Sequence, residues 1–493
     1  MDRSNLRCVL PYDDLREWIT EADRLGELRV VRGASWEEDI GLAAEAVIKQ
    51  DDGPAVLFDD VEGCPPGYRV IMNVFAGKRR NMTLGFPDEL SKSELSDACY
   101  EGFVKDRKTV PHEIVDHGPV LENVLAGDDI DLMKFPTPIW HVEDGGRYIG
   151  TGCLTVTRDP DDGWLNVGTY RAMVHDKSSI GVLMVPGKHG HVHREKYFAR
   201  GEKCPIVMVL GSDPMAFYAA CTEAPSGTCE LDLVGGIRGA PVQCVRGELT
   251  GLPFPANCEI AVEGYLVAGH DRMEGPFGEW TGYYASGEHP EPVLQIERLY
   301  HRNDPIILGV PPMGGGSDEM GRYRAVLRSA MVKEALASAG VPDVTGVWCY
   351  EIGSSRLLHG VAIRQRYPGH AKQAGHIAAT CHAANYANRY VVVVDDDIDV
   401  TDLEELWWAL LTRSDPASSI DIIGGARTSP ADPLLHPDRR GSGDLSMGRA
   451  VIDACRPFHW KDDFPKVNAP SPAEAEAARR RFGHLLDGSD GAD

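Results

Sequence analysis

Two carboxylates in the segment 274–279 (EGPFGE) are placed for acid–base chemistry. Glu274 and Glu279 flank a Gly-Pro turn that brings them close together. Closely spaced carboxylates raise one of their two pKa values, which suits a proton donor at neutral pH. The same spacing also fits a polar surface turn, a glycosidase pair or a metal-dependent hydrolase. Spacing alone therefore indicates a candidate site without fixing its reaction.

A second candidate segment is 166–171 (NVGTYR), within a region of short strands. Residues five apart face opposite sides of a regular strand, so Asn166 and Arg171 can converge only if the strand breaks or bulges. Gly168 permits such a break. The alternative is an ordinary barrel strand with one polar inner residue.

Two further segments could hold a metal. In 188–193 (KHGHVH), three histidines at alternate positions would fit zinc on a strand, but Gly190 and the following basic residues indicate a loop that enters a helix. A single histidine ligand is therefore favoured. Glu230 and Asp232 follow a Ser-Gly-Thr turn and could bind a hard cation, or could form a solvated turn.

Composition excludes several classes of protein. The formal net charge of −25 disfavours nucleic acid and anionic membrane surfaces as partners. Twelve cysteines stand singly without a C-x-x-C pair, and the N-terminus lacks a signal-peptide core, so we expect a cytoplasmic protein. No apolar run is long enough to span a bilayer. Neither a P-loop, a Rossmann fingerprint nor a G-x-S-x-G elbow is present.

The pattern of elements predicts four parts. Helix and strand signals alternate over 1–115 and again over 316–460, which indicates two α/β domains. Between them, 116–315 contains many short strands separated by Gly, Pro and Asp turns, which favours a barrel or sandwich. The tail, 461–493, contains a capped helix from Ser471 to about Leu486 that we expect to serve oligomerisation.

The order of these segments resembles the UbiD family of prenylated-FMN-dependent decarboxylases. N-V-G-x-Y-R, a histidine about 20 residues later, an acidic segment and E-G-P-F-G-E occur here in the family's order. The late strand and acid run at 389–399 and the Asp-Ala pair at 453–454 extend the resemblance over residues 10–460. It implies an α/β N-terminal domain, a central split β-barrel of the flavin-reductase-like type and an α/β C-terminal domain.

The resemblance also implies cofactors: prenylated FMN, Mn²⁺ and K⁺. The positions that match manganese ligands are Asn166, His189 and Glu230, a mixed donor set suited to that ion. Those that match potassium-coordinating positions are Val167, Ala220 and Thr222. The expected flavin-binding set is Asn166, Gly168, Thr169, Tyr170, Arg171, Lys188, His189, Thr222, Glu230 and Arg389.

Arg171, Glu274 and Glu279 match the family's catalytic network. The resemblance implies that Arg171 orients the substrate carboxylate and pairs with Glu274, while Glu279 delivers the proton that replaces CO₂. Arg389 and Arg449 stand where many members have lysine, and Lys188 differs from the usual residue there. Arginine at position 389 would contact a phosphate with a geometry different from that of lysine. The difference at Lys188 affects the details of the substrate more than the class of reaction.

The expected reaction is reversible, non-oxidative decarboxylation of an aromatic or α,β-unsaturated acid. The substrate could be a hydroxybenzoate or an unsaturated acid of secondary metabolism. A flavin prenyltransferase would supply the cofactor, and the enzyme would be a homodimer or homohexamer. The alternative is a non-catalytic flavin- or metal-binding subunit of a larger decarboxylase.

Overall fold

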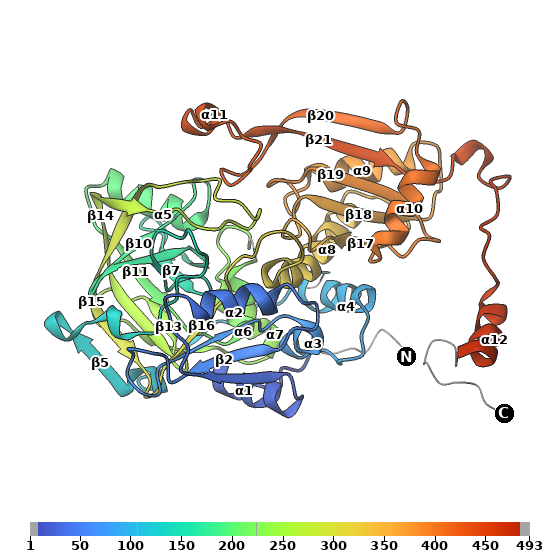
Figure 1. The fold of residues 1–493 in the computed structure, drawn as a ribbon. Helices are drawn as coiled ribbons and strands as arrows, with labels where there is room; N and C mark the ends of the chain where they lie inside the picture. Colours follow the sequence, from blue (N-terminus) through green and yellow to red (C-terminus); the bar gives the residue numbers. More distant parts are fainter. Residues whose placement is uncertain (1–7, 106, 223, 484–493) are drawn as a thin grey trace.

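The computed structural model describes residues 8–105, 107–222 and 224–483. Its N-terminal part is a four-stranded sheet with helices around it (Figure 1). The strand order is β1 (Leu28–Arg32), β2 (Ala55–Asp59), β3 (Arg69–Met72) and β16 (Ile306–Gly309). The helices are α1 (Leu15–Arg24), α2 (Asp39–Ile48), α3 (Gly77–Thr83) and α4 (Lys92–Cys99), followed by a π-helical turn, Tyr100–Lys105.

Strand β16 comes from the end of the segment 116–315 but lies beside β3 of this N-terminal sheet. All four of its residues are buried, so its apolar run needs cover on both faces. The last strand of the central segment thus joins the two parts, and the predicted boundaries at 115, 315 and 460 stay a prediction.

The central part is a nine-stranded antiparallel sheet that curls into an open half-barrel (Figure 1). Its order is β6-β9-β10-β15-β14-β11-β7-β8, with β5 paired to β15, which confirms the predicted split barrel. The strands are β5 (Asn123–Ala126), β6 (Arg147–Tyr148), β7 (Leu154–Arg158), β8 (Leu165–Gly168), β9 (Ala172–Asp176), β10 (Ser179–Val182), β11 (Cys204–Val209), β14 (Ile260–Glu274) and β15 (His289–His301).

Smaller elements surround this sheet. The helices are α5 (His189–Ala199), α6 (Pro214–Ala220) and α7 (Glu230–Arg238). A three-stranded sheet has the order β13 (Pro253–Pro255), β12 (Gln243–Arg246) and β4 (Glu113–Ile114), and 3₁₀ turns lie at Pro119–Glu122, Gly127–Asp129 and Leu132–Lys134. Asp213 caps α6 by accepting from the amides of Met215 and Ala216, as the Asp-Pro pair predicts.

The C-terminal part is a five-stranded sheet with the order β17-β18-β19-β21-β20. Its strands are β17 (Val344–Cys349), β18 (Leu358–Ile363), β19 (Tyr390–Asp395), β20 (Ile420–Arg427) and β21 (Ser446–Asp453). Its helices are α8 (Glu319–Ser338), α9 (His370–Thr380), α10 (Leu403–Arg413) and the short α11 (Pro437–Gly441), with a 3₁₀ turn at Phe458–Trp460. The valine run of β19 is buried between two parallel neighbours, as its continuous apolar sequence predicts.

The predicted tail helix is present as α12 (Pro472–Phe482), and Ser471 forms its capping box with Glu474. Residues 484–486 of the predicted helix lie outside the described residues. Figure 1 shows α12 set apart from the sheets, at the end of an extended segment. No helix in the described part of the chain is long and apolar enough to cross a membrane.

Helix α8 is tied to the N-terminal sheet through a buried carboxylate. Glu319 accepts hydrogen bonds from the amides of Asn73 (3.0 Å), Val74 and Phe75 (3.1 Å). Burial raises the pKa of Glu319 to about 7. Because an unfolded glutamate titrates near about 4.3, the folded protein holds this proton more tightly. The contribution to stability is therefore complete below that value and is lost as pH rises through about 7.

We expect the unfolding free energy of Glu319→Gln to vary less with pH than that of the unsubstituted protein. Between about pH 4 and pH 8 the unsubstituted protein should lose up to about 3 kcal/mol more of its unfolding free energy than the variant, since the variant lacks the titrating group. Denaturant unfolding at several pH values measures this difference. Parallel profiles would show that Glu319 titrates alike in the folded and unfolded chain.

Candidate active site

Three charged side chains meet where two strands end. Strand β8 ends at Gly168 and β9 begins at Ala172, so the predicted break is present and Arg171 lies in it. Glu274 is the last residue of the long strand β14. Arg171 donates through Nε to Glu274 Oε1 (2.8 Å), through Nη2 to Glu274 Oε2 (2.7 Å) and through Nη1 to Glu279 Oε1 (2.7 Å).

The network is shielded from water. The side chain of Glu274 is 0% exposed, and those of Arg171 and Glu279 are 9% and 12% exposed. The guanidinium carbon lies 4.9 Å from the ring centre of Phe277 and 5.9 Å from that of Tyr148. Burial disfavours the charged guanidinium, but the two carboxylates outweigh it and raise the pKa of Arg171. Arg171 is thus a fixed cation between two carboxylates.

Glu279 keeps one oxygen available. Its Oε1 accepts from Arg171 and from Ser286 Oγ (2.7 Å). Among the described residues, Oε2 has no hydrogen-bond partner. The backbone turn that follows is closed by bonds from Glu279 N to Tyr283 O (3.1 Å) and from Gly282 N to Glu279 O (2.8 Å). The carboxylate is therefore held at one oxygen while the other can exchange a proton.

Residues from a distant loop hold this turn. Gly278 N donates to Asp144 Oδ1 (2.9 Å), and the same carboxylate accepts from His141 Nδ1 (2.9 Å to Oδ2). His141 Nε2 lies 2.6 Å from the carbonyl oxygen of Pro312. Burial lowers the pKa of His141, but Asp144 and this carbonyl raise it overall, because both ring nitrogens face acceptors. Sequence reasoning missed both residues, because neither stands in a recognisable motif.

The three predicted manganese ligands stand on β8 and on two helices that contact it. Asn166 lies on β8, His189 begins α5 and Glu230 begins α7. Glu230 Oε2 accepts from Val167 N (2.7 Å). The Tyr170 hydroxyl accepts from Gly190 N (2.8 Å) and lies 3.5 Å from Asn166 Nδ2. These contacts link β8 and the residues after it to the first turns of both helices.

The chemistry of the donors fits a divalent cation. Burial raises the pKa of Glu230 to about 8, and no cationic side chain among the described residues pairs with it. A bound divalent ion would hold this carboxylate in its ionised form. Asn166 uses Nδ2 as a donor to Thr157 Oγ1 (3.3 Å), which leaves its Oδ1 as a possible ligand. An amide oxygen, an imidazole and a carboxylate suit manganese.

The remaining predicted contacts divide into two groups. Thr169 Oγ1 lies 3.4 Å from Cys221 Sγ, so the segment 220–222 that carries Ala220 and Thr222 lies beside the strand break. Lys188 occupies the position directly before α5, next to His189. Arg389 is not brought to this group: it pairs with Asp432 (2.5 Å) in the C-terminal part.

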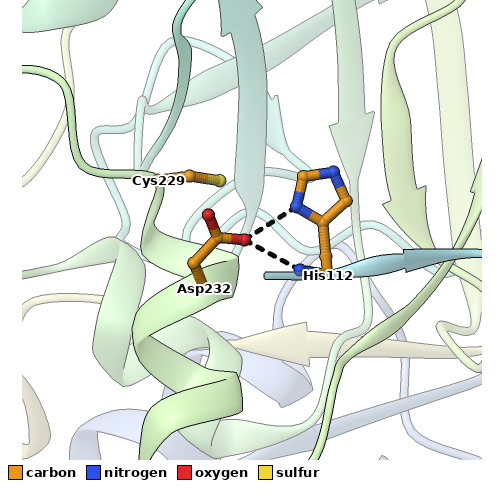
Figure 2. A group of neighbouring side chains, drawn as sticks. All are labelled: His112, Cys229 and Asp232. Carbon is orange, nitrogen blue, oxygen red and sulfur yellow. Dashed lines mark hydrogen bonds and ion pairs between the residues drawn. The ribbon is translucent and has the colours of Figure 1, made fainter. Parts of the chain in front are cut away.

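A second set of possible metal ligands lies nearby. Figure 2 shows His112, Cys229 and Asp232, whose ligand atoms lie within 4.8 Å of one another. Asp232 Oδ1 accepts from both His112 N (2.9 Å) and His112 Nδ1 (2.8 Å). Burial raises the pKa of Cys229 to about 12, so its thiol is protonated at neutral pH. This group therefore serves to attach His112 to α7 and fixes the first turn that carries Glu230.

Gly190 makes room for Tyr170. A Cβ on Gly190 would lie 2.6 Å from the Tyr170 hydroxyl oxygen, which is closer than packed atoms approach. We expect Gly190→Ala to displace this tyrosine and to weaken Mn²⁺ binding by about tenfold or more, as losses of supporting contacts around metal sites do. Isothermal titration of the purified protein with Mn²⁺ measures the effect. Gly424→Ala, where a Cβ meets nothing within 4 Å, is the matched control. Equal affinities would contradict the assigned role of Tyr170.

A cleft of about 1920 Å³ opens beside the acidic turn. The segment 280–284 that follows Glu279 forms one wall, together with His141 and Met313. The opposite wall belongs to the C-terminal part and is apolar, with Trp407 and Leu411 of α10. Arg171, Glu274 and Glu279 are not among the residues that line the cleft, but the lining begins at Trp280, directly after Glu279.

Three family models match this chain, each described for 3-octaprenyl-4-hydroxybenzoate carboxy-lyase: the N-terminal domain at residues 19–99, the Rift-related domain at 113–315 and the C-terminal domain at 323–454. The chain is 30% identical to pyrrole-2-carboxylic acid decarboxylase of Pseudomonas aeruginosa, over 95% of this chain and 96% of that protein.

Solved structures give the same fold. Vanillic acid decarboxylase of Sedimentibacter hydroxybenzoicus, in its closed form, matches with a TM-score of 0.83 at 28% identity over 96% of this chain and 99% of the other. The UbiD-class enzyme HmfF of Pelotomaculum thermopropionicum, in complex with FMN, matches with a TM-score of 0.80 at 27% identity over 94% and 98%. An evolved dimeric form of HmfF, in complex with prFMN, matches with a TM-score of 0.78 at 26% identity over the same shares.

The fold and the matches define a carboxy-lyase built around a flavin-binding half-barrel. The chain belongs to the UbiD family of prenylated-FMN-dependent decarboxylases, as its motifs predict.

Proposed function

We propose that this chain catalyses the reversible, non-oxidative decarboxylation of an aromatic or α,β-unsaturated acid, with Arg171, Glu274 and Glu279 as its catalytic residues. The observation that carries the proposal is one guanidinium that bonds two carboxylates of different burial. Glu274 is fully enclosed and held at both oxygens, so it fixes Arg171. Glu279 is less enclosed, at 12% exposure, and keeps Oε2 available, so it moves the proton.

The residues act on the substrate in a defined order. Arg171 orients the substrate carboxylate by its charge, and the Phe277 and Tyr148 rings keep water away from that contact. When CO₂ has left, protonated Glu279 gives its proton to the carbon that carried the carboxylate. The Ser286 hydroxyl holds Oε1 during this transfer, so the donor stays aligned. In the carboxylation direction the same oxygen receives the proton.

The cofactor would lie on the half-barrel, between the Arg171 network and the predicted manganese ligands. Asn166, His189 and Glu230 would hold Mn²⁺, with K⁺ near Val167, Ala220 and Thr222. Gly168, Thr169, Tyr170 and Lys188 would line the flavin. Bound prenylated FMN supplies the electron sink that accepts the electron pair of the broken carbon–carbon bond.

The substrate class follows from the cleft. Its apolar wall and the aromatic residues of 280–284 suit an aromatic or extended unsaturated acid more than a small polar one. Exposed apolar side chains on the C-terminal part that do not line the cleft, such as Trp408, Ile422 and Leu434, favour a homo-oligomer.

The test is to express the chain with and without a flavin prenyltransferase and to identify the bound flavin by mass spectrometry. The two preparations are then compared for CO₂ release from a panel of aromatic and unsaturated acids. We expect prenylated FMN and CO₂ release only after co-expression. A loaded chain that releases no CO₂ alone but does so with added subunits would favour a non-catalytic subunit.

A further inference from the structure

The side-chain amide of Asn166 can bind a cation only through its oxygen. An amide has an acceptor oxygen at one end and a donor NH₂ group at the other. If the amide were turned over, it would present N–H hydrogens to the cation and repel it. The residue is buried, at 3% exposure, so neighbouring protein groups set this orientation. Those neighbours therefore decide whether Asn166 can be a ligand.

The Thr157 hydroxyl contacts this amide. Thr157 lies on β7 directly opposite Asn166 on β8, so the two side chains share one face of the sheet. Thr157 Oγ1 lies 3.3 Å from Asn166 Nδ2 and 2.9 Å from His193 Nδ1 on α5. Both Thr157 and His193 are completely buried. Because a hydroxyl has a single proton, Thr157 can donate to only one of these two neighbours.

His193 is the neighbour that takes this proton. Burial lowers the pKa of His193 to about 4, so its ring is neutral and carries one N–H at neutral pH. Its Nε2 lies 3.7 Å from Asp159 Oδ2, and the same carboxylate oxygen forms an ion pair with Lys196. A carboxylate favours the tautomer that turns an N–H, and not a lone pair, toward it. Nε2 thus carries the proton, and Nδ1 accepts from the Thr157 hydroxyl.

We propose that an orienting triad (Asp159, His193 and Thr157) turns the side-chain amide so that its oxygen faces the manganese ion. The inference rests on the proposed metal site and adds positioning residues to it. Because its proton is committed to His193, Thr157 can only accept from Asn166, which leaves Oδ1 for the cation. The Tyr170 hydroxyl, 3.5 Å from Nδ2, can donate or accept, so it does not decide the orientation.

The test is Mn²⁺ binding to the metal-free chain, with the free ion followed by electron paramagnetic resonance. We expect Thr157→Val, which keeps the shape but lacks the hydroxyl, to weaken Mn²⁺ binding by about tenfold or more, as losses of supporting contacts around metal sites do. Thr157→Ser should restore most of the affinity. Thr155→Val is the matched control, because Thr155 is also completely buried on β7. It should change the affinity by less than about threefold, since among the described residues its hydroxyl bonds none of the predicted ligands.

The Asn166→Asp variant separates orientation from packing, because both ends of a carboxylate are oxygen atoms. In that background we expect Thr157→Val to change Mn²⁺ affinity far less than it does in the unsubstituted chain. Equal losses in the two backgrounds would show that Thr157 only packs against its neighbours. An unchanged affinity in Thr157→Val alone would also overturn the inference.

His193→Phe tests the triad from its other end, even if the valine variant does not fold. It keeps a ring but removes the acceptor, so the hydroxyl proton can turn toward Asn166 and Mn²⁺ binding should weaken. Full affinity in this variant would contradict the triad. Asn166→Ala tests the metal site itself: if its affinity equals that of the unsubstituted chain, the proposed metal site fails. A loss in Asn166→Ala without any loss in Thr157→Val overturns the triad alone.

Discussion

Arg171→Met should abolish decarboxylation and destabilise the protein. Loss of the guanidinium removes the group that orients the substrate carboxylate, and we expect kcat/KM to fall by at least about 10³-fold. Glu274 would remain enclosed without a cation, which costs about 3–5 kcal/mol when one partner of a buried pair is removed. Because a lone buried carboxylate takes up a proton instead, this cost should shrink at low pH.

Denaturant unfolding at pH 8 and pH 5, together with steady-state rates, tests this expectation. Arg171→Lys is the control, since it keeps the charge but loses the paired bonds to Glu274 and should keep more stability than the methionine variant. An Arg171→Met protein as stable as the unsubstituted one at both pH values would refute the buried pair. Retained activity would remove Arg171 from the catalytic set.

Glu279→Gln should stop proton transfer and leave the cofactor bound. An amide of the same shape can still meet Arg171 through its oxygen, but it cannot deliver a proton. We expect kcat to fall by about 10²–10⁴-fold, the usual contribution of a general acid. The measurements are CO₂ release and hydrogen–deuterium exchange of the product, both in cofactor-loaded protein. The nearby exposed residue Glu288 gives the matched control, Glu288→Gln, which should keep full activity.

Much of the site could be predicted because its residues lie in short local motifs. The break after Gly168 follows from one glycine between Asn166 and Arg171, and the structure ends β8 there. The buried strand β19 follows from a run of valines that suits a parallel sheet with both faces covered. These features depend on neighbours in sequence, so periodicity and turn chemistry are sufficient to find them.

Contacts between distant segments could not be predicted in this way. Asp144 binds the amide of Gly278 across 134 residues, and only the folded half-barrel brings the two together. Likewise, nothing near Arg389 in the sequence predicts its pairing with Asp432, because the loop that carries Asp432 returns from another strand.

The Glu274–Arg171–Glu279 network is expected to replace the substrate carboxylate by a proton. The most direct measurement incubates the cofactor-loaded chain with its best acid in D₂O and determines the product by mass spectrometry. We expect one deuterium at the carbon that carried the carboxylate, with one CO₂ released for each product formed. No CO₂ from any acid of the panel, although prenylated FMN and Mn²⁺ are bound, would contradict a role of this network in decarboxylation.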